Sequence, residues 1–283
     1  MFLNPENFVS ALSFLGLFIF TFLVARWVIS IISPFSINEE ITKNKNVALA
    51  ISLSGYFIGM TAVFIGVYDR PFSGEWMDDI QHIGGYSLLG VILLNISQFI
   101  NDKLILYQFS NHKKIIEDRN LGTGIVQAAS YIASGLVIGG ALNSPGGNII
   151  TSLAFFVFGQ ACLVLFSLLY EWLTPYSVHR EIEEKNTAAG LGFSGGFISI
   201  GIIVMKGVSG EFLSWSDNLS LLAFNVEIIF IYLIFVRFFF DKIIIPHVDL
   251  NKQISVEKNT GAGLLEFIIS VSFSLVLFYI INH

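Results

Sequence analysis

The peptide EKNTAAG, Glu184 to Gly190, returns seventy-three residues later as EKNTGAG, Glu257 to Gly263. Two weaker copies precede them: NKNVALA, which begins at Asn44, and DRNLGTG, which begins at Asp118. Each copy has charged residues, a central asparagine and then small residues, and a long apolar run follows it. Self-similarity of this kind predicts that the chain is built from four related segments.

The spacing of the four central asparagines indicates a larger repeat of two segments. Their successive separations are 74, 66 and 73 residues, whereas alternate ones lie 140 and 139 residues apart. The stretch DKLIL at Asp102 matches DKIII at Asp241 with the same offset. The sequence therefore predicts a tandem duplication of a four-helix unit, with domains 1–145 and 146–283. The asparagines are Asn46, Asn120, Asn186 and Asn259.

The composition identifies a membrane protein. Of the 283 residues, 54% are hydrophobic and 13% are charged, whereas a soluble domain carries about 25% charged residues. Eight apolar runs each approach the ~20 residues that a helix needs to cross a hydrocarbon core, where helices satisfy their own backbone groups. We predict an all-α polytopic integral membrane protein whose eight transmembrane helices form four hairpins of parallel orientation. The predicted spans are Phe8–Ile32, Val47–Tyr68, Gly84–Ile100, Leu121–Leu142, Ile149–Leu173, Thr187–Met205, Leu219–Phe240 and Thr260–Ile281.

The basic residues predict the orientation. Thirteen of the fifteen Lys and Arg residues lie in the loops after the odd-numbered runs or at the adjoining helix ends, and only Arg70 and Lys206 lie on the other side. The positive-inside rule therefore places those loops in the cytoplasm and both termini outside, in the periplasmic or extracellular space. The same loops hold nearly as many acidic residues, which argues against nucleic-acid binding.

The segment TPYSVHREIEEKNTAAGLGFSGG, Thr174 to Gly196, resembles the signature of the YjfL-like bacterial inner-membrane proteins, the domain of unknown function 350 family. The motif residues are Thr174-Pro175, Asn186-Thr187-Ala188-Ala189 and Phe193-Ser194-Gly195, with looser counterparts at Ser33-Pro34, Asn46-Val47-Ala48 and Leu53-Ser54-Gly55. The resemblance covers the whole chain as two tandem units. It implies a bacterial inner (plasma) membrane location and a tie to envelope-stress systems, and it implies no reaction.

Two kinds of helix are predicted. The odd-numbered runs are rich in bulky residues, whereas the even-numbered runs carry small ones at spacings such as Gly135/Gly139 and Gly192/Gly196. Small residues let helix backbones approach closely in lipid. We expect an inner layer of even-numbered helices with the odd-numbered helices outside, facing lipid. The small residues serve packing alone, or they line a narrow path or a sliding interface.

The central asparagines are predicted N-caps, because an asparagine side chain accepts a backbone N–H at a helix start. Each stands where the chain re-enters the membrane from the cytoplasm. Capping explains the motif without a ligand. The alternative is that four helix N-termini converge at the cytoplasmic mouth and attract an anion.

Two carboxylates are predicted to lie within the bilayer. Glu227 stands eight residues into the seventh run, about 12 Å from its outer end, and Glu266 stands seven residues past Asn259, about 10 Å from the cytoplasmic end. Ionisable groups at such depth are expensive and mark pathways or pairs. Arg237 is a candidate partner for Glu266 in a structural ion pair, which is the alternative to a proton or cation site.

Further polar candidates come from the first half. Gln127 occupies the position equivalent to Glu266, seven residues past its own asparagine. Asn95, Gln98 and Asp102 recur at a spacing that puts them on one helix face. The offset pairs Gln98 with Arg237, so the first half has amides where the second half has charges.

Two functions remain open. The first is a small transporter or channel that uses the intramembrane carboxylates as proton or cation sites. The alternative is a non-transporting membrane scaffold or envelope-stress component that recruits a cytoplasmic partner. The expected partners are the lipid bilayer, a homo-oligomer copy and a cytoplasmic protein. No catalytic residues, metal site or cofactor are predicted, and an enzyme is not expected because the sequence has no nucleophile–base pair.

Overall fold

The computed structural model describes residues 5–69, 73–105, 111–244, 246 and 248–280. Within them the chain is helical, and eight helices are long and apolar enough to cross a membrane, so the prediction of an eight-span membrane protein is confirmed. The long helices are α1 (Pro5–Ile32), α3 (Val47–Tyr68), α4 (Trp76–Leu104), α6 (Leu121–Leu142), α7 (Ile149–Leu173), α9 (Thr187–Val208), α10 (Trp215–Phe239) and α12 (Thr260–Ile280). The predicted end of the last span, Ile281, lies outside the described residues.

Most predicted boundaries agree closely with the helices, and α4 differs most. It begins at Trp76 instead of Gly84. Its first turns are polar and include Asp78 and Asp79, which suit the positive end of the helix dipole but interrupt an apolar run. Hydropathy therefore gave the membrane-embedded part of α4 and missed its polar extension.

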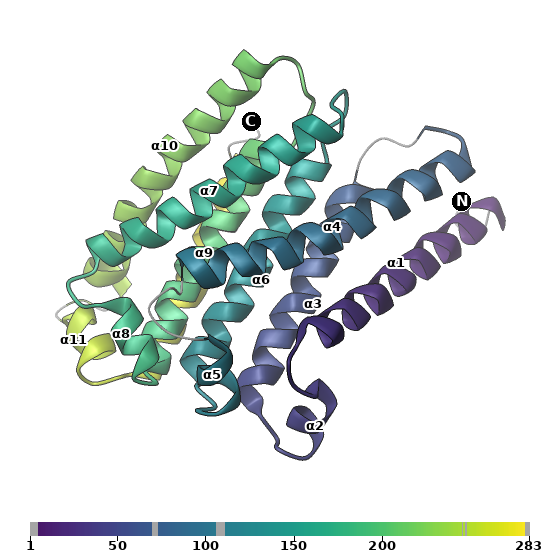
Figure 1. The fold of residues 1–283 in the computed structure, drawn as a ribbon. Helices are drawn as coiled ribbons and strands as arrows, with labels where there is room; N and C mark the ends of the chain where they lie inside the picture. Colours follow the sequence, from purple (N-terminus) through teal and green to yellow (C-terminus); the bar gives the residue numbers. More distant parts are fainter. Residues whose placement is uncertain (1–4, 70–72, 106–110, 245, 247, 281–283) are drawn as a thin grey trace.

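Four short helices were not predicted, and each precedes one of the asparagine motifs. They are α2 (Ile37–Thr42), α5 (Asn111–Ile116), α8 (Val178–Glu183) and α11 (Leu250–Ser255). The side chains of Ser36, Ser177 and Asp249 cap α2, α8 and α11 by accepting backbone N–H groups. A helix of six residues is too short to show a recognisable apolar periodicity, so the sequence pattern predicted loops for these segments. All four lie at one end of the molecule (Figure 1), which we name the short-helix end.

The helices α3, α6, α9 and α12 form a row in which each packs along the next. Glycines make this approach close: a Cβ added at Gly190 of α9 would lie 2.8 Å from the Cα of Gly122 in α6. The helices α4 and α7 cross in front of the row (Figure 1), with α4 on α3 and α6 and with α7 on α6 and α9.

The predicted inner layer of even-numbered helices is found only for α6 and α9, in the middle of the row. Most residues of α6 and α9 are buried, but α12 closes the row and exposes large residues such as Ile268, Leu275 and Tyr279. At the other end of the row, α3 has Gly55, Gly59 and Gly66 against α6. Small residues thus line the faces where row helices meet, and bulky ones lie where the row ends against lipid.

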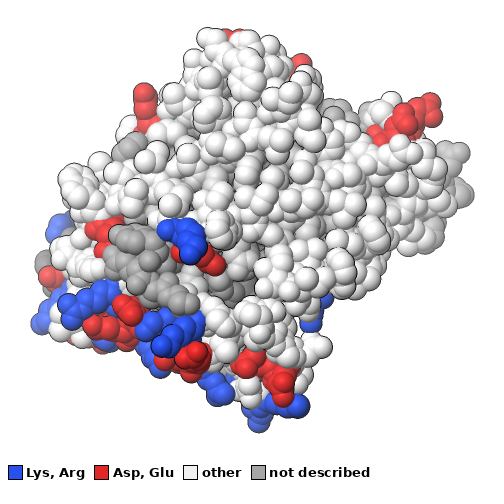
Figure 2. Space-filling model, viewed as in Figure 1, with Lys and Arg blue, Asp and Glu red and all other residues white. Residues whose placement is uncertain are grey.

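Charge is concentrated at the short-helix end. Figure 2 shows Lys and Arg gathered there and interleaved with Asp and Glu, while the middle of the face in view is almost without charge and a few acidic groups lie at the opposite end. The nearly uncharged middle fits contact with lipid hydrocarbon, where an unpaired charge is costly.

Candidate functional site

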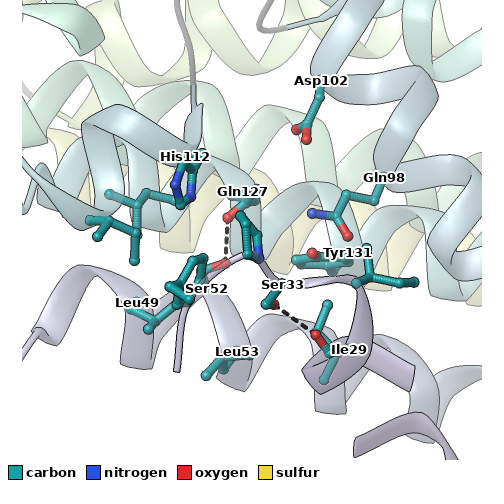
Figure 3. Close-up of a pocket in the computed structure, with 15 residues that line it drawn as sticks. Ile29, Ser33, Leu49, Ser52, Leu53, Gln98, Asp102, His112, Gln127 and Tyr131 are labelled. Carbon is teal, nitrogen blue, oxygen red and sulfur yellow. Dashed lines mark hydrogen bonds between the residues drawn. The ribbon is translucent and has the colours of Figure 1, made fainter. Parts of the chain in front are cut away.

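A cavity of about 220 Å³ opens into the first half of the bundle near the short-helix end. It lies between α1, α3, α4, α5 and α6, and the linker after α1 forms part of its wall. Figure 3 shows Asp102 and Gln98 on one side of it and Leu49 and Leu53 opposite. The fifteen lining residues are Ile29, Ile32, Ser33, Pro34, Phe35, Leu49, Ser52, Leu53, Gln98, Asp102, His112, Ile115, Ile116, Gln127 and Tyr131.

Three of the predicted polar residues meet in this cavity: Gln98, Asp102 and Gln127. The carboxylate of Asp102 accepts a hydrogen bond from the side-chain amide of Asn111 at 2.7 Å. The hydroxyl of Ser52 in α3 donates to the side-chain carbonyl of Gln127 in α6 at 2.5 Å, as drawn in Figure 3. Asp102 is half-buried and is the one carboxylate among the lining residues.

Aromatic and aliphatic groups complete the wall. The rings of Phe35 and His112 stack at 5.1 Å between centroids, and Tyr131 packs edge-on against Tyr56 at 5.2 Å. Asn95, predicted on the same face as Gln98 and Asp102, lies outside the cavity and donates to the hydroxyl of Tyr56 at 3.2 Å. The site thus combines one charge with amides, hydroxyls and an apolar wall, which is the usual make-up of a small-ligand pocket.

The equivalent place in the second half is occupied differently. Glu266, which corresponds to Gln127, is buried in α12 and accepts a hydrogen bond from the hydroxyl of Tyr170 at 3.4 Å. Ser52 is replaced there by Gly192, and a Cβ at Gly192 would lie 2.5 Å from a carboxylate oxygen of Glu266. The side chain of Arg237 lies outside the described residues, so its pairing with Glu266 stays a prediction.

Glu227 is separate from both places. It is exposed on α10, on the side of the helix that α9 does not cover. Asn225, nearly opposite it on the helix, is buried against Gly207 of α9. The structure therefore brings Gln98, Asp102 and Gln127 together but leaves Glu227 outside that group.

Each central asparagine stands at the N-cap position of a row helix. The side-chain oxygens of Asn46, Asn120, Asn186 and Asn259 accept backbone N–H groups at 3.0 to 3.2 Å. In three copies the side-chain amide also donates to an isoleucine carbonyl in the short helix of the following hairpin. These bonds run from Asn46 to Ile115, from Asn120 to Ile182 and from Asn186 to Ile254, at 2.9, 2.7 and 2.7 Å.

The last copy differs from the other three. Asn259 is exposed, and its amide donates to the side chain of Gln253 within its own hairpin at 2.8 Å. The sequence predicted the cap and missed the bond to the next hairpin, because the partner is a backbone atom that any residue would supply.

A buried polar cluster in the centre of the bundle was also missed. Asn101 of α4 donates to Ser130 and Ser134 of α6 at 2.6 and 3.0 Å, and Gln160 of α7 donates to the side-chain oxygen of Asn101. Asn101 directly precedes Asp102, so the cluster adjoins the cavity. The sequence does show polar residues in apolar runs of two different hairpins, but nothing in it indicates that α4 and α7 are in contact.

Like the bond between Gln160 and Asn101, a contact of His179 joins the two halves. His179 lies in α8 and is buried. One ring nitrogen lies 2.9 Å from a carboxylate oxygen of Glu171, and the other lies 2.5 Å from the carbonyl oxygen of Ile105 at the end of α4. Burial alone would lower the pKa of His179, but the bonds to Glu171 and Ile105 outweigh it and raise the pKa above its ordinary value. Two acceptors on one ring favour the doubly protonated imidazolium.

Comparison with known proteins identifies the repeated unit. The family model described as Domain of Unknown Function (DUF350) matches residues 2–142 and again residues 146–281. The chain belongs to the DUF350 family. It is also 25% identical, over 238 residues, to the UPF0719 transmembrane protein of Aquifex aeolicus (strain VF5), a match that covers 81% of this chain and 84% of that protein. No solved structure matches the chain.

The two DUF350 matches confirm the tandem duplication. Both matched segments contain the asparagine caps, but Asp102 and its cavity belong to the first segment and Glu266 to the second. The two DUF350 units therefore share a framework and differ in the polar groups that they enclose. The name of the relative states a transmembrane protein, and neither name states an enzymatic activity.

Proposed function

We propose that the chain is a membrane carrier or channel for a small cation, protons included, and that Asp102 holds the charge of that cation. The observation that supports this most is a half-buried carboxylate in a cavity between membrane helices, beside two amides. Ionisable groups among membrane helices usually belong to an ion or solute pathway. The positive-inside rule assigns the short-helix end to the cytoplasm, so the cavity would load from there, with the termini outside the inner membrane.

The polar groups beyond the cavity suggest the direction of a path. From Gln127 and Tyr131, α6 leads to Ser134 and the cluster around Asn101. Further on, the described residues of α6 from Val137 to Leu142 are buried and apolar or glycine. That segment would be the gate, and Glu266 would be the counterpart of Gln127 in the second half.

Reconstitution in liposomes tests the proposal. Purified protein should conduct or exchange a small monovalent cation, with protons, alkali cations and primary alkylammonium ions as the tested species, and Asp102→Asn should lower the flux at least about tenfold. Glu117→Gln is the matched control, because Glu117 is an exposed carboxylate at the same end of the molecule. Flux no higher than in empty liposomes, or equal flux in the Asp102 variant, would refute the proposal.

The apolar segment of α6 favours a second candidate, a scaffold that transports nothing and recruits a cytoplasmic protein through the short-helix end. Its surface carries interleaved charges (Figure 2), including Lys114, which bridges Asp118 and Glu183 at 3.3 Å each. Charge reversal at the exposed Lys113 and Lys252 should then abolish recruitment without changing the fold. We propose neither an enzyme nor a resident cofactor for either candidate, and a homo-oligomer is compatible with both.

A further inference from the structure

We infer that the ligand of the Asp102 cavity is a small primary alkylammonium ion and not a bare metal cation. This inference rests on the proposed function in one respect, namely that the cavity takes a cation. It goes further by assigning the chemical class of that cation from the distribution of polar and apolar groups around the cavity.

The acidic groups are too few for a divalent metal ion. Calcium and magnesium take six or more oxygen ligands, usually with several carboxylates. Asp102 is the single carboxylate among the lining residues, and no group of three His, Cys, Asp or Glu side chains suited to a metal occurs in the described part of the chain. One carboxylate matches one positive charge, which is the charge of an ammonium group.

The oxygens beside Asp102 match the donors of a primary ammonium group. Such a group has three N–H donors and no acceptor. Asp102, Gln98 and Gln127 line the cavity, and each of these side chains carries an oxygen that can accept such a donor. Gln127 already accepts from Ser52 at 2.5 Å, but a carbonyl oxygen has a second lone pair. A quaternary ammonium ion, which has no N–H group, could not use these acceptors.

The opposite wall suits an alkyl chain. Leu49 and Leu53 face Asp102 across the cavity (Figure 3), and Ile29, Ile115 and Ile116 add further aliphatic surface. Burying one methylene group there contributes about 0.8 kcal/mol. A hydrated metal ion would gain nothing from this wall.

The size and the aromatic groups are consistent with the same ligand. A cavity of about 220 Å³ is far larger than the ~10–15 Å³ that a single water molecule needs, so it has room for a short alkyl chain beside the ammonium group. The stacked rings of Phe35 and His112 border the cavity, and the face of Phe35 would attract a cation.

Isothermal titration of the detergent-purified full chain tests the inference with n-butylammonium as the probe. We expect binding that Asp102→Asn weakens at least about tenfold, with Glu117→Gln unchanged. Tetramethylammonium and magnesium should not compete. Equal competition by magnesium, or butylammonium affinity that is the same in the Asp102 variant, would overturn the inference.

A second variant keeps the test decisive if Asp102→Asn does not fold. Leu53→Phe should fill the apolar side, so that butylammonium binding is lost while methylammonium binding remains. If the variant lost both probes or retained both, this would contradict a ligand whose ammonium group lies at Asp102 and whose alkyl chain lies against Leu53. Failure of amine binding while Asp102-dependent ion flux persists would refute this inference alone, whereas amine binding without flux would refute the carrier and leave the inference standing.

Discussion

Asn120 uses each of its polar groups for a different contact. Its backbone N–H donates to the carbonyl of Lys114 at 2.9 Å, and its side-chain oxygen accepts from the backbone of Thr123 at 3.2 Å. Its side-chain amide donates to Ile182 at 2.7 Å, which lies in the second unit. The residue is fully buried, so a lost partner there cannot be replaced by bulk water.

Replacement of Asn120 by aspartate should separate these roles. The new carboxylate would still cap the helix, but it would place an oxygen against the carbonyl of Ile182. We expect Asn120→Asp to lower the free energy of unfolding by about 2–3 kcal/mol, measured by thermal unfolding in detergent. Asn259→Asp is the control, since Asn259 is exposed and its amide bonds within its own hairpin, and it should cost less than about 0.5 kcal/mol. Equal losses would show that capping alone matters.

At the scale of the helix, the row depends on backbone contact. Gly190 and Gly122 approach so closely that a Cβ added at Gly190 meets main-chain atoms at 2.8 and 3.0 Å. Backbone atoms cannot move aside as a flexible side chain can, so α9 and α6 would have to separate. Interiors that are packed this tightly lose stability when a methyl group is forced in.

Gly190→Ala should therefore destabilise the protein by about 1–3 kcal/mol. The matched change is Gly85→Ala in α4, where nothing lies within 4 Å of the added Cβ. Alanine is the better helix former by about 1 kcal/mol, so Gly85→Ala should leave the melting temperature unchanged or raise it. The row model fails if both variants melt at the same temperature.

At the scale of the whole molecule, the two units are joined by polar contacts at the short-helix end and in the centre of the bundle. The bond from Asn120 to Ile182, the cluster of Asn101 with Gln160, and the contact of His179 with Ile105 all cross the junction. Of these contacts, the one through His179 contains a group that titrates near neutral pH.

The contribution of His179 should fall as the pH rises. Its folded pKa lies above the ordinary value of 6.5, so the stabilisation is fully present below that value and is lost as the pH rises through the folded pKa. The groups bonded to the ring include the carboxylate of Glu171 and the carbonyl of Ile105. Melting temperatures of the wild type and of His179→Gln, measured from about pH 6 to about pH 9, should converge toward the alkaline end. A constant difference between them would contradict a charged His179.

Hydropathy predicted the spans and repetition predicted the duplication, because both patterns can be read along the chain. The predicted inner layer of even-numbered helices holds for α6 and α9, whereas α12 is largely exposed. The sequence grouped Gln98 and Asp102 correctly on one face of a helix, but the cavity also needs Ser52 and Phe35 from other elements. Which faces meet depends on helix packing, which no spacing in the sequence records. Asn101 and Gln160 were missed for the same reason.

The bonds from Asn46, Asn120 and Asn186 all run from one hairpin to the short helix of the next hairpin along the chain. Among the described residues, the amide of Asn259 in the last hairpin bonds instead to Gln253 in its own hairpin, and α2 of the first hairpin is the short helix for which no such asparagine bond is found. A separated first unit would expose Asn120 as a donor without its Ile182 carbonyl. Two such units lying side by side in the same orientation could form an equivalent bond, from the asparagine of one unit to α2 of the other. Joining two such units in one chain would make this association intramolecular, so that it would no longer depend on the encounter of two separate half-length chains in the membrane.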